Sequence, residues 1–292
     1  MWEEQIAVVP PYYFEKVLDR LSLDPLSAVD LEEKSIRVPL RDKESAPHVI
    51  KVKAVGTAAE PQFEVTGKDP SFKEAAIAEI RRIFQWDVPL ADIQQHFSSS
   101  MLSKIFEEHE GTPLILDFSL YASLMRCIIH QQLNLAFAQV LTERFVHQFG
   151  ECVDGVWFFP SPETAAEIEV QQLRDLQFSG RKAEYVIDTS KLIASGEIDL
   201  EKMKHESNEE IMKKLIKVRG IGAWTVQNIL LFGLGRQNLF PLADVGIQNA
   251  LKQVYGMEKK PTAEEMEELS KDWHPYLSYA SLYLWRSIEK KK

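Results

Sequence analysis

The sequence predicts a mainly α-helical protein in which an α+β region precedes a larger all-α region. Two observations carry this prediction. Alternating apolar and polar residues, the pattern of a half-buried strand, occur mainly in the first part of the 292-residue chain. From about Asp117 onward, apolar residues recur at helical spacing between short loops. We therefore expect an N-terminal α+β domain over residues 1–112 and an all-α domain over residues 113–292.

The N-terminal region shows strand patterns followed by one helix pattern. Apolar and polar residues alternate over residues 35–38, 50–55 and 63–65. Asp69-Pro70 is a helix start signal, and apolar residues then recur at helical spacing from Phe72 to Phe84. We therefore expect an antiparallel sheet with a helix packed on it. No catalytic motif occurs in this region, which predicts a scaffolding role.

Within the helical region, two helix patterns flank a pair of glycines. The upstream helix starts with the capping-box sequence Ser207–Glu210, and its apolar residues continue to Ile216. The downstream helix carries apolar residues over Trp224–Phe232 and is expected to end near the glycines that follow. Gly220 and Gly222 lie between the two helices. This arrangement predicts a helical hairpin.

The glycine pair predicts a tight turn with free backbone donors. Glycine adopts conformations that other residues avoid, so Gly220 and Gly222 permit a turn too tight for most side chains. The N–H groups there lie at the N-terminus of the second helix, where free donors and the helix dipole both favour an anion. The sequence therefore predicts a phosphate site, although a plain pair of packed helices also explains the two glycines.

Composition limits the function classes. Hydrophobic residues make up 45% of the chain and charged residues 27%, which is ordinary for a soluble globular protein. No apolar run is long enough to span a membrane, and Met1–Glu4 is acidic rather than a signal peptide, so we expect a cytoplasmic protein without membrane contacts. Two cysteines are too few for a disulfide framework or a four-cysteine iron–sulfur cluster, and the seven histidines show no zinc-like spacing. We expect no cofactor and no required metal.

The net charge of −10 argues against a nonspecific nucleic-acid binder, because such proteins are usually basic. A local positive face would still suffice for transient binding. The candidate cations beside the glycine turn and in an earlier helix are Lys213, Lys214, Lys217, Arg219, Arg181 and Lys182. Each of them is also typical of a solvated helix face.

The glycine turn is one of several segments that match a known family. Asp244 follows it within Leu239–Ile247, ahead of another apolar helix. Three further stretches fit the same pattern: Cys127–Asn134, Phe178–Tyr185 and Trp273–Trp285. From about residue 114 to residue 285, the chain resembles the helix-hairpin-helix DNA glycosylase superfamily. Pro10–Tyr12, ahead of the α+β region, is similar to the start of the bacterial 3-methyladenine DNA glycosylase II branch.

The resemblance implies hydrolysis of the N-glycosidic bond to an alkylated purine, a step of base excision repair whose partner is double-stranded DNA containing alkylated bases. Alkylation puts positive charge on the base and makes it a good leaving group, so the charge that develops on the deoxyribose remains to be stabilised. A carboxylate near the sugar does this and can orient or deprotonate the attacking water. Asp244 is the catalytic candidate. It is also a good helix N-cap, and the two roles are compatible because a helix N-terminus favours the ionised form.

Trp224 separates two classes of enzyme within the superfamily. Members that also cut the DNA strand place a lysine at this position, and its amine forms a Schiff base. Tryptophan has no nucleophilic nitrogen. The resemblance therefore implies a monofunctional glycosylase that leaves an intact abasic strand, although Trp224 is equally explained as a core residue.

A wedge residue is expected because a base must leave the duplex before the enzyme can reach it. The segment that matches the family's wedge is Gln131–Leu133. A leucine of the close branch corresponds to Gln132, whereas here the leucine comes one residue later. Both Gln132 and Leu133 are therefore wedge candidates, and a plain core role for Leu133 is the alternative.

The base pocket is expected to contain electron-rich rings, since these attract an electron-poor alkylated base. Trp285 occupies the family position for a pocket tryptophan. The base-pocket candidates are four aromatic residues: Trp285, Trp224, Tyr12 and Tyr283. Two departures from the branch affect the expected substrate range, because Asn228 stands where the branch has a tyrosine and Leu277 where it has an arginine.

The resemblance also assigns contacts with the DNA backbone to the glycine turn. The phosphate-binding candidates are Arg219, Gly220, Gly222, Ala223 and Thr225. In the family, backbone carbonyls of the hairpin can hold a hydrated cation between protein and phosphate, and Val218 and Ile221 would supply them here. The chemistry itself requires no metal. We expect a monomer, because an enzyme that scans DNA needs no twofold-symmetric site.

Two other functions stay open. A non-catalytic helix-hairpin-helix protein that docks on DNA would account for the acidic charge, for Asn228 and for Leu277. A glycosylase for deaminated or oxidised bases would need an acid to assist the departure of a neutral base, and the sequence shows no obvious acid for that task.

Overall fold

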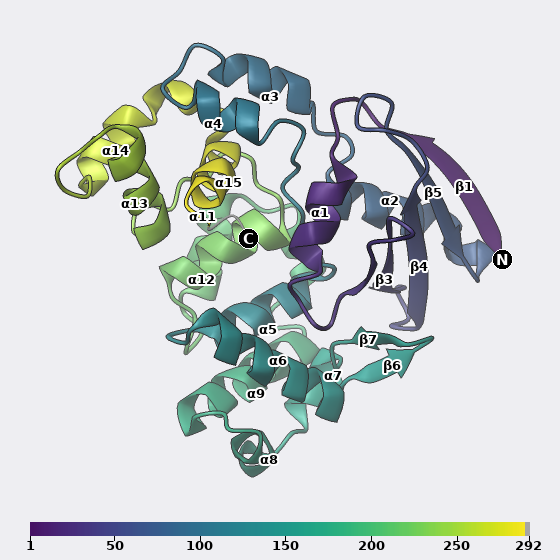
Figure 1. Cartoon of the computed structure of the whole chain (residues 1–292). Helices are drawn as coiled ribbons and strands as arrows, with labels where there is room; N and C mark the ends of the chain where they lie inside the picture. The colour runs from purple at the N-terminus through teal and green to yellow at the C-terminus, as the bar shows by residue number, and fades with distance from the viewer. Residues whose placement is uncertain (290–292) are drawn as a thin grey trace.

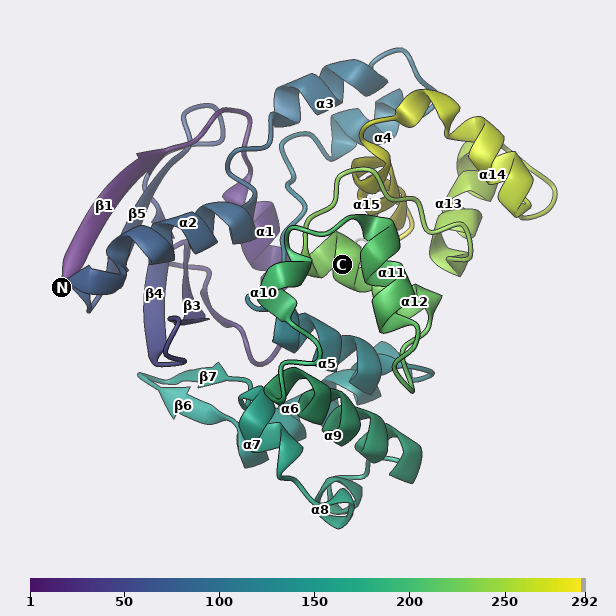
Figure 2. The same cartoon turned by 180° about the vertical axis from the view of Figure 1, so that it is seen from behind.

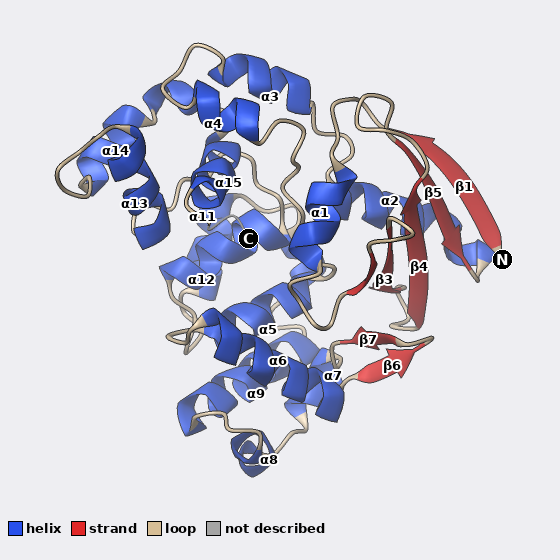
Figure 3. Ribbon diagram, in the orientation of Figure 1, coloured by secondary structure: helices blue, strands red, loops and turns tan. Residues whose placement is uncertain are grey.

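In the computed structural model, which describes residues 1–289, helices fill most of the molecule and one antiparallel sheet lies at its N-terminal edge (Figures 1 and 3). The sheet has five strands in the order β1-β5-β4-β3-β2. Its strands are β1 (Trp2–Ala7), β2 (Ala28–Asp30), β3 (Ser35–Arg41), β4 (Pro47–Ala54) and β5 (Gln62–Gly67). A mainly α-helical protein with an N-terminal α+β part, as predicted, is confirmed.

Alternation along the central strands creates the buried face of the sheet. Ile36 lies opposite Val52, and Val38 lies opposite Ile50, so buried apolar pairs cover one side of β3 and β4. Helix α2 (Lys73–Phe84) packs on the sheet and begins after a short 3-10 turn at Pro70–Phe72 (Figure 2). The predicted sheet with a packed helix is confirmed.

Other elements of the N-terminal part were not predicted. These are β1, β2, α1 (Phe14–Leu21), α3 (Leu90–Phe97) and α4 (Ser103–Glu108). In β1, the alternation is broken because Glu4 lies between the buried Trp2 and Ile6. Pairing with β5, in which Ile6 lies opposite Phe63, holds this strand in the sheet instead.

The all-α part follows as a series of helices joined by short loops. They are α5 (Leu120–His130), α6 (Leu135–Phe149), α7 (Pro162–Ala166), α8 (Val170–Asp175), α9 (Gly180–Ala194), α10 (Leu200–Met203), α11 (Asn208–Leu215), α12 (Ala223–Asn228), α13 (Val245–Val254), α14 (Ala263–Leu269) and α15 (Leu277–Ser287). Helix α12 continues into a π-helical turn at Ile229–Gly233, so the downstream helix of the hairpin ends where expected. No helix that the structure describes is long and apolar enough to cross a bilayer.

A small β-hairpin, β6 (Glu151–Val153) and β7 (Val156–Phe158), interrupts the helices and was not predicted. Its turn and both of its strands contact the large sheet (Figure 1). The Arg37 Nη1 atom donates to the Asp154 carbonyl over 2.7 Å, and Arg41 forms an ion pair with Glu151 at 3.2 Å. Strands of three residues carry too short a pattern to be recognised, and these contacts with the sheet stabilise them.

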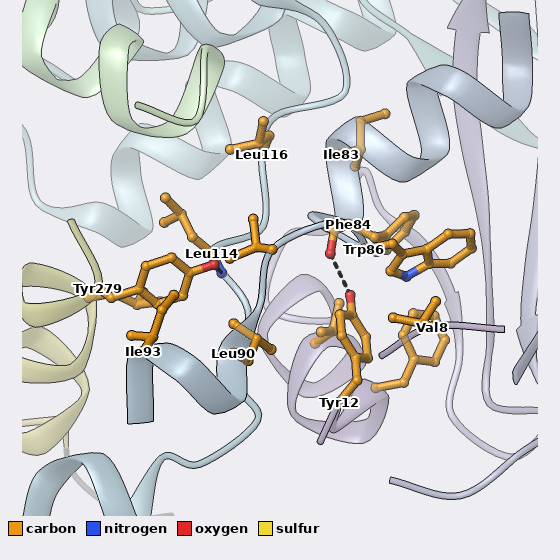
Figure 4. Packing of buried hydrophobic residues seen from close by; sticks show 14 of the residues in the cluster. Val8, Tyr12, Ile83, Phe84, Trp86, Leu90, Ile93, Leu114, Leu116 and Tyr279 are labelled. Carbon is orange, nitrogen blue, oxygen red and sulfur yellow. Dashed lines mark hydrogen bonds between the residues drawn. The ribbon is translucent and has the colours of Figure 1, made fainter. Parts of the chain in front are cut away.

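Buried side chains form two clusters that each join distant parts of the chain. The first combines the sheet and α2–α4 with the C-terminal helices α13–α15, and the second combines α5–α12. Figure 4 shows part of the first cluster, where Leu114 and Leu116 lie between Ile83 of α2 and Tyr279 of α15. The expected boundary near residue 112 stays a prediction. The C-terminal helices share a core with the N-terminal region, and the loop before α13 lies where the two clusters meet.

Candidate active site

The helical hairpin has the geometry that its sequence predicts. The Ser207 hydroxyl accepts from the Glu210 N–H, and the Glu210 carboxylate accepts from the Ser207 N–H, so the capping box at the start of α11 is complete. Helix α12 begins directly after Gly222, which is its N-cap residue. The turn therefore presents the N-terminus of α12.

The two glycines of the turn differ in backbone conformation and in the space available for a side chain. Gly220 has a φ of +89°, and a Cβ atom there would lie 2.4 Å from the Tyr185 ring of α9. Both backbone conformation and contact therefore exclude a side chain. Gly222 has an ordinary extended conformation, and a Cβ atom there would meet nothing within 4 Å. The space in front of Gly222 is open to solvent.

The turn carries free backbone donors. Among the residues that the structure describes, none accepts from the N–H groups of Ala223, Trp224 or Thr225. Gly222, Ala223 and Trp224 are exposed, and Trp224 retains 45% of its accessible surface. Three adjacent donors at a solvent-facing helix start form a suitable site for a phosphate oxygen.

The candidate cations differ in their partners. Arg219 pairs with Glu184 at 2.6 Å, reaches Asp188 at 3.9 Å and lies over the Tyr185 ring. Lys214 pairs with Glu206, and Lys182 is directed into the protein. Three exposed cations have no ion-pair partner in the described part of the chain: Lys213, Lys217 and Arg181.

Asp244 caps α13 and is held by an aromatic residue of α15. Its Oδ1 atom accepts from the Ile247 N–H at 2.9 Å and from the Trp285 indole Nε1–H at 2.8 Å. The Oδ2 atom accepts no hydrogen bond from any described residue. One carboxylate oxygen therefore fixes the side chain, and the other remains available to water or to a sugar. The predicted N-cap role of Asp244 is confirmed.

Trp285 itself contacts two neighbouring residues. Its ring is stacked on Phe232 of the π-helical turn, with ring centroids 5.9 Å apart and planes inclined by 28°. Gly246 also lies close to the ring, since a Cβ atom there would come within 3.1 Å of the indole. The half-buried ring therefore links the end of the hairpin to the Asp244 carboxylate.

Two serines of α15 anchor the segment that leads to Asp244. The Ser278 hydroxyl donates to the Arg236 carbonyl at 2.6 Å and accepts from the Leu239 N–H at 3.0 Å. The Ser281 hydroxyl donates to the Leu239 carbonyl at 3.2 Å. These two serines were not predicted, although small polar residues on the apolar face of the last helix pattern indicate buried hydrogen bonds.

The wedge candidates follow the end of α5. Gln132 is exposed and has a φ of +57°, a left-handed conformation that is uncommon for a residue other than glycine. Leu133 is half-buried and packs against the second core cluster. The loop lies beside the glycine turn, because the Gln131 side-chain amide donates to the Gly220 carbonyl at 2.8 Å and to the Thr225 hydroxyl at 3.1 Å.

Two of the aromatic candidates lie in the first core cluster instead of at a surface. Tyr12 is 2% exposed, and its hydroxyl donates to the Phe84 carbonyl at 2.7 Å (Figure 4). Tyr283 is 3% exposed, and its hydroxyl donates to the Thr112 carbonyl at 2.9 Å. Their contact with a base stays a prediction, and in this conformation both rings are covered by other side chains.

The two departures from the branch have plain structural roles. Asn228 donates from its side chain to the Trp224 carbonyl at 2.8 Å, one turn earlier in the same helix. Leu277 is buried at the start of α15.

The hairpin carbonyls are oriented by the turn itself. The Val218 carbonyl accepts from the Ile221 N–H at 3.0 Å, while the Gly220 carbonyl accepts from Gln131. No cluster of His, Cys, Asp and Glu suited to a metal ion occurs among residues 1–289. A cation held by the carbonyls of Val218 and Ile221 stays a prediction.

The fold and the site together define a helix-hairpin-helix protein with an aspartate held at the start of the helix that follows the hairpin. The family model described as "HhH-GPD superfamily base excision DNA repair protein" matches residues 125–275, and the chain belongs to that superfamily. Within it, the chain lies in the branch whose members are named DNA-3-methyladenine glycosylases.

Two relatives from Bacillus subtilis (strain 168) and one solved structure illustrate this placement. YfjP, whose name assigns it provisionally to the DNA-3-methyladenine glycosylases, is 60% identical over 99% of this chain and 100% of its own length. A protein named DNA-3-methyladenine glycosylase is 38% identical over 74% of this chain and 73% of its own. The structure of a 3-methyladenine DNA glycosylase from Archaeoglobus fulgidus superposes with a TM-score of 0.83 over 98% of both chains, at 22% identity. That last likeness establishes the fold.

Proposed function

We propose that this protein is a monofunctional DNA glycosylase that flips alkylated purines of the 3-methyladenine and 7-methylguanine type out of double-stranded DNA and hydrolyses their N-glycosidic bond. The observation that carries the proposal is the Asp244 carboxylate. It has one oxygen fixed by Ile247 and Trp285 and one oxygen free, in a chain that belongs to a base excision repair superfamily. The names of the relatives support the alkylpurine class.

The chemistry follows from the charge on the lesion. An alkylated purine leaves with the bonding electron pair of the bond between C1′ and the base nitrogen, and it departs as a neutral base. Positive charge then develops on the sugar, and the Asp244 carboxylate stabilises it. A water molecule oriented by the free Oδ2 atom adds its oxygen to C1′ and loses a proton to the carboxylate or to solvent. The products are the free base and an abasic strand.

The strand is expected to stay intact because no amine stands at the position after the glycine turn. Trp224 occupies that position, and the Lys182 ammonium group is directed into the protein. DNA backbone contact is assigned to the N–H groups of Ala223, Trp224 and Thr225 and to the free cations beside them. We further propose that the protein works as a monomer in the cytoplasm.

The test measures release of 3-methyladenine and 7-methylguanine from methylated duplex DNA by the wild type and by Asp244→Asn. The wild type should release both bases, with strand breaks only after hot alkali. Asp244→Asn should keep DNA binding and lose about 10²–10³-fold in the rate of release. The matched control is Asp92→Asn, which removes an exposed carboxylate of α3.

Each alternative function predicts a different result. DNA binding without release of any base would point to a docking protein. Release of hypoxanthine or 8-oxoguanine, without release of methylated purines, would point to a glycosylase for deaminated or oxidised bases. An Asp244→Asn variant with full turnover would exclude Asp244 as the catalytic residue.

A further inference from the structure

Lys182 makes an unusual set of contacts for a lysine beside a predicted DNA surface. Its ammonium group donates to the carbonyls of Ile128 at 3.1 Å, Ile129 at 2.6 Å and Gln131 at 2.9 Å. These carbonyls belong to the end of α5, where the last carbonyls of a helix have no helical partner. An ammonium group has three donors, and all three are used here.

The position of this charge separates it from the other candidate cations. No carboxylate pairs with Lys182 in the part of the chain that the structure describes, and its side chain is half-buried between α9 and the end of α5. Burial lowers the pKa of Lys182 to about 8, so the group is still mostly protonated at neutral pH. The negative end of the α5 dipole favours a cation here. Lys182 therefore bonds to the protein interior and leaves phosphate binding to other residues.

The third carbonyl links this contact to the wedge loop. Gln131 accepts from Lys182 through its backbone and donates through its side chain to Gly220 and Thr225 of the hairpin. The next residue, Gln132, is exposed and left-handed. Gln131 is thus held by Lys182 through its backbone and by the hairpin through its side chain, immediately before the exposed Gln132.

We propose that Lys182 is a positioning residue that holds the loop Gln131–Leu133 in the conformation that enters the base stack. The proposal rests on the base-flipping part of the proposed function, because a wedge is needed only by a protein that flips bases. Without the ammonium group, the three carbonyls form hydrogen bonds with water instead, and the loop samples several conformations. Ordering it again then reduces the affinity of every complex in which the wedge is inserted.

The test compares binding of the full-length protein to two duplexes of one sequence, one undamaged and one with an abasic-site analogue whose gap the wedge fills. Lys182→Met should lower the preference for the abasic duplex about tenfold, since ordering costs of this size accompany loop immobilisation. Its affinity for the undamaged duplex should change less than about twofold, because the ammonium group does not face DNA. Lys191→Met, which removes an exposed lysine of the same helix, is the matched control.

A second variant separates the loss of positioning from a loss of folding in Lys182→Met. Lys182→Arg keeps the charge, but a planar guanidinium cannot direct three donors at three convergent carbonyls as an ammonium group does. We expect it to fold and to lose several-fold in abasic preference. A double variant supplies a further check: in a Gln132→Ala/Leu133→Ala background, Lys182→Met should have little additional effect on that preference.

The outcomes distinguish this proposal from the proposed function. An unchanged abasic preference in Lys182→Met and in Lys182→Arg would overturn it. Equal loss of affinity for both duplexes, with a weaker salt dependence, would make Lys182 a phosphate ligand and also overturn it. An additive effect in the wedge-deleted background would contradict action through the loop. If the wild type releases no base, yet prefers the abasic duplex and loses that preference in Lys182→Met, the proposed hydrolysis fails while the positioning role of Lys182 stands.

Discussion

At the scale of single residues, the site depends on one carboxylate whose orientation is set by its neighbours. A free aspartate side chain rotates among several conformations, whereas Asp244 is fixed through Oδ1 by a backbone N–H and by the Trp285 indole. Substitutions that leave Asp244 in place but disturb this pairing should therefore reduce the rate of base release.

Gly246→Ala tests this pairing while leaving both Asp244 and Trp285 unsubstituted. A Cβ atom at residue 246 would lie 3.0 Å from the Asp244 Oδ1 atom and 3.1 Å from the Trp285 Cδ1 atom, so the carboxylate or the indole must shift. We expect the rate of base release to fall about tenfold or more, because a displacement of about 1 Å in a catalytic group can reduce the rate up to about 10²-fold. Stability should change little, since the gain of about 0.5–1 kcal/mol from alanine in a helix offsets the crowding.

Single-turnover release and urea unfolding of the same variant check this expectation. Gly256→Ala is not a suitable control because residue 256 has a positive φ. Gly180→Ala, at an open position of α9 with nothing within 4 Å, is the matched control. Full activity of Gly246→Ala would show that the pairing of Asp244 with Trp285 does not set the rate.

At the scale of elements, the two glycines of the hairpin should respond in opposite ways to the same substitution. Gly220→Ala places a side chain at a φ of +89° and against the Tyr185 ring, which should cost roughly 2 kcal/mol or more of stability. Gly222→Ala meets open space, so its stability should stay within about 0.5 kcal/mol of the wild type. Its DNA affinity should fall, because the new methyl group occupies the space that a phosphate would enter.

Urea unfolding and duplex binding, measured on both variants, separate the two effects. A stable Gly220→Ala would contradict the close approach of the turn to α9. A Gly222→Ala variant with unchanged DNA affinity would contradict phosphate binding at the start of α12.

The local elements were more predictable from sequence than the contacts between them. The capping box at Ser207 and the turn at Gly220 follow from neighbouring residues, so their patterns were visible in the chain. The hydrogen bond from Trp285 to Asp244 joins residues 41 positions apart, and the inward direction of Lys182 depends on how α9 packs on α5. No local pattern encodes such contacts. Tyr12 matched a family position, yet its ring is covered by the first core cluster.

At the scale of the whole molecule, acid should destabilise the protein through a partly buried histidine. Burial, aided by the nearby Arg126 charge, lowers the pKa of His130 to about 4, and its ring contacts the Thr142 hydroxyl. Between pH 6.5 and 4, the unfolded chain binds a proton at this residue and the folded protein does not. Stability should therefore fall by roughly 3 kcal/mol from this group across that interval, with no further loss from it below pH 4.

Urea unfolding at pH 7, 5.5 and 4.5 measures this loss by comparison with His130→Gln, which should lose less stability on acidification than the wild type. His147→Gln, at an exposed position of α6, is the control and should follow the wild type. Identical acid sensitivity of the wild type and His130→Gln would show that other groups dominate.

The distribution of charge over the whole molecule determines how strongly its affinity for DNA depends on salt. The net charge is −10, and at the predicted DNA surface Arg219 and Lys214 are already paired with carboxylates. Lys213, Lys217 and Arg181 remain as the exposed cations without an ion-pair partner among the described residues. If each neutralises one phosphate, the logarithm of the affinity for undamaged duplex should fall with the logarithm of salt concentration with a slope of about −3. This is a shallow dependence for a DNA-binding protein.

Single substitutions test whether those three cations are the ones that contact phosphate. Changing Lys213, Lys217 or Arg181 to Met should each reduce the magnitude of the slope by about 1, because one fewer counterion is released. Lys214→Met should change it less, since its charge is already balanced by Glu206. A slope steeper than about −4 would mean that further cations reach the DNA, as Arg219 and Lys214 could if their ion pairs open on binding. Equal effects of Lys214→Met and Lys217→Met would lead to the same conclusion.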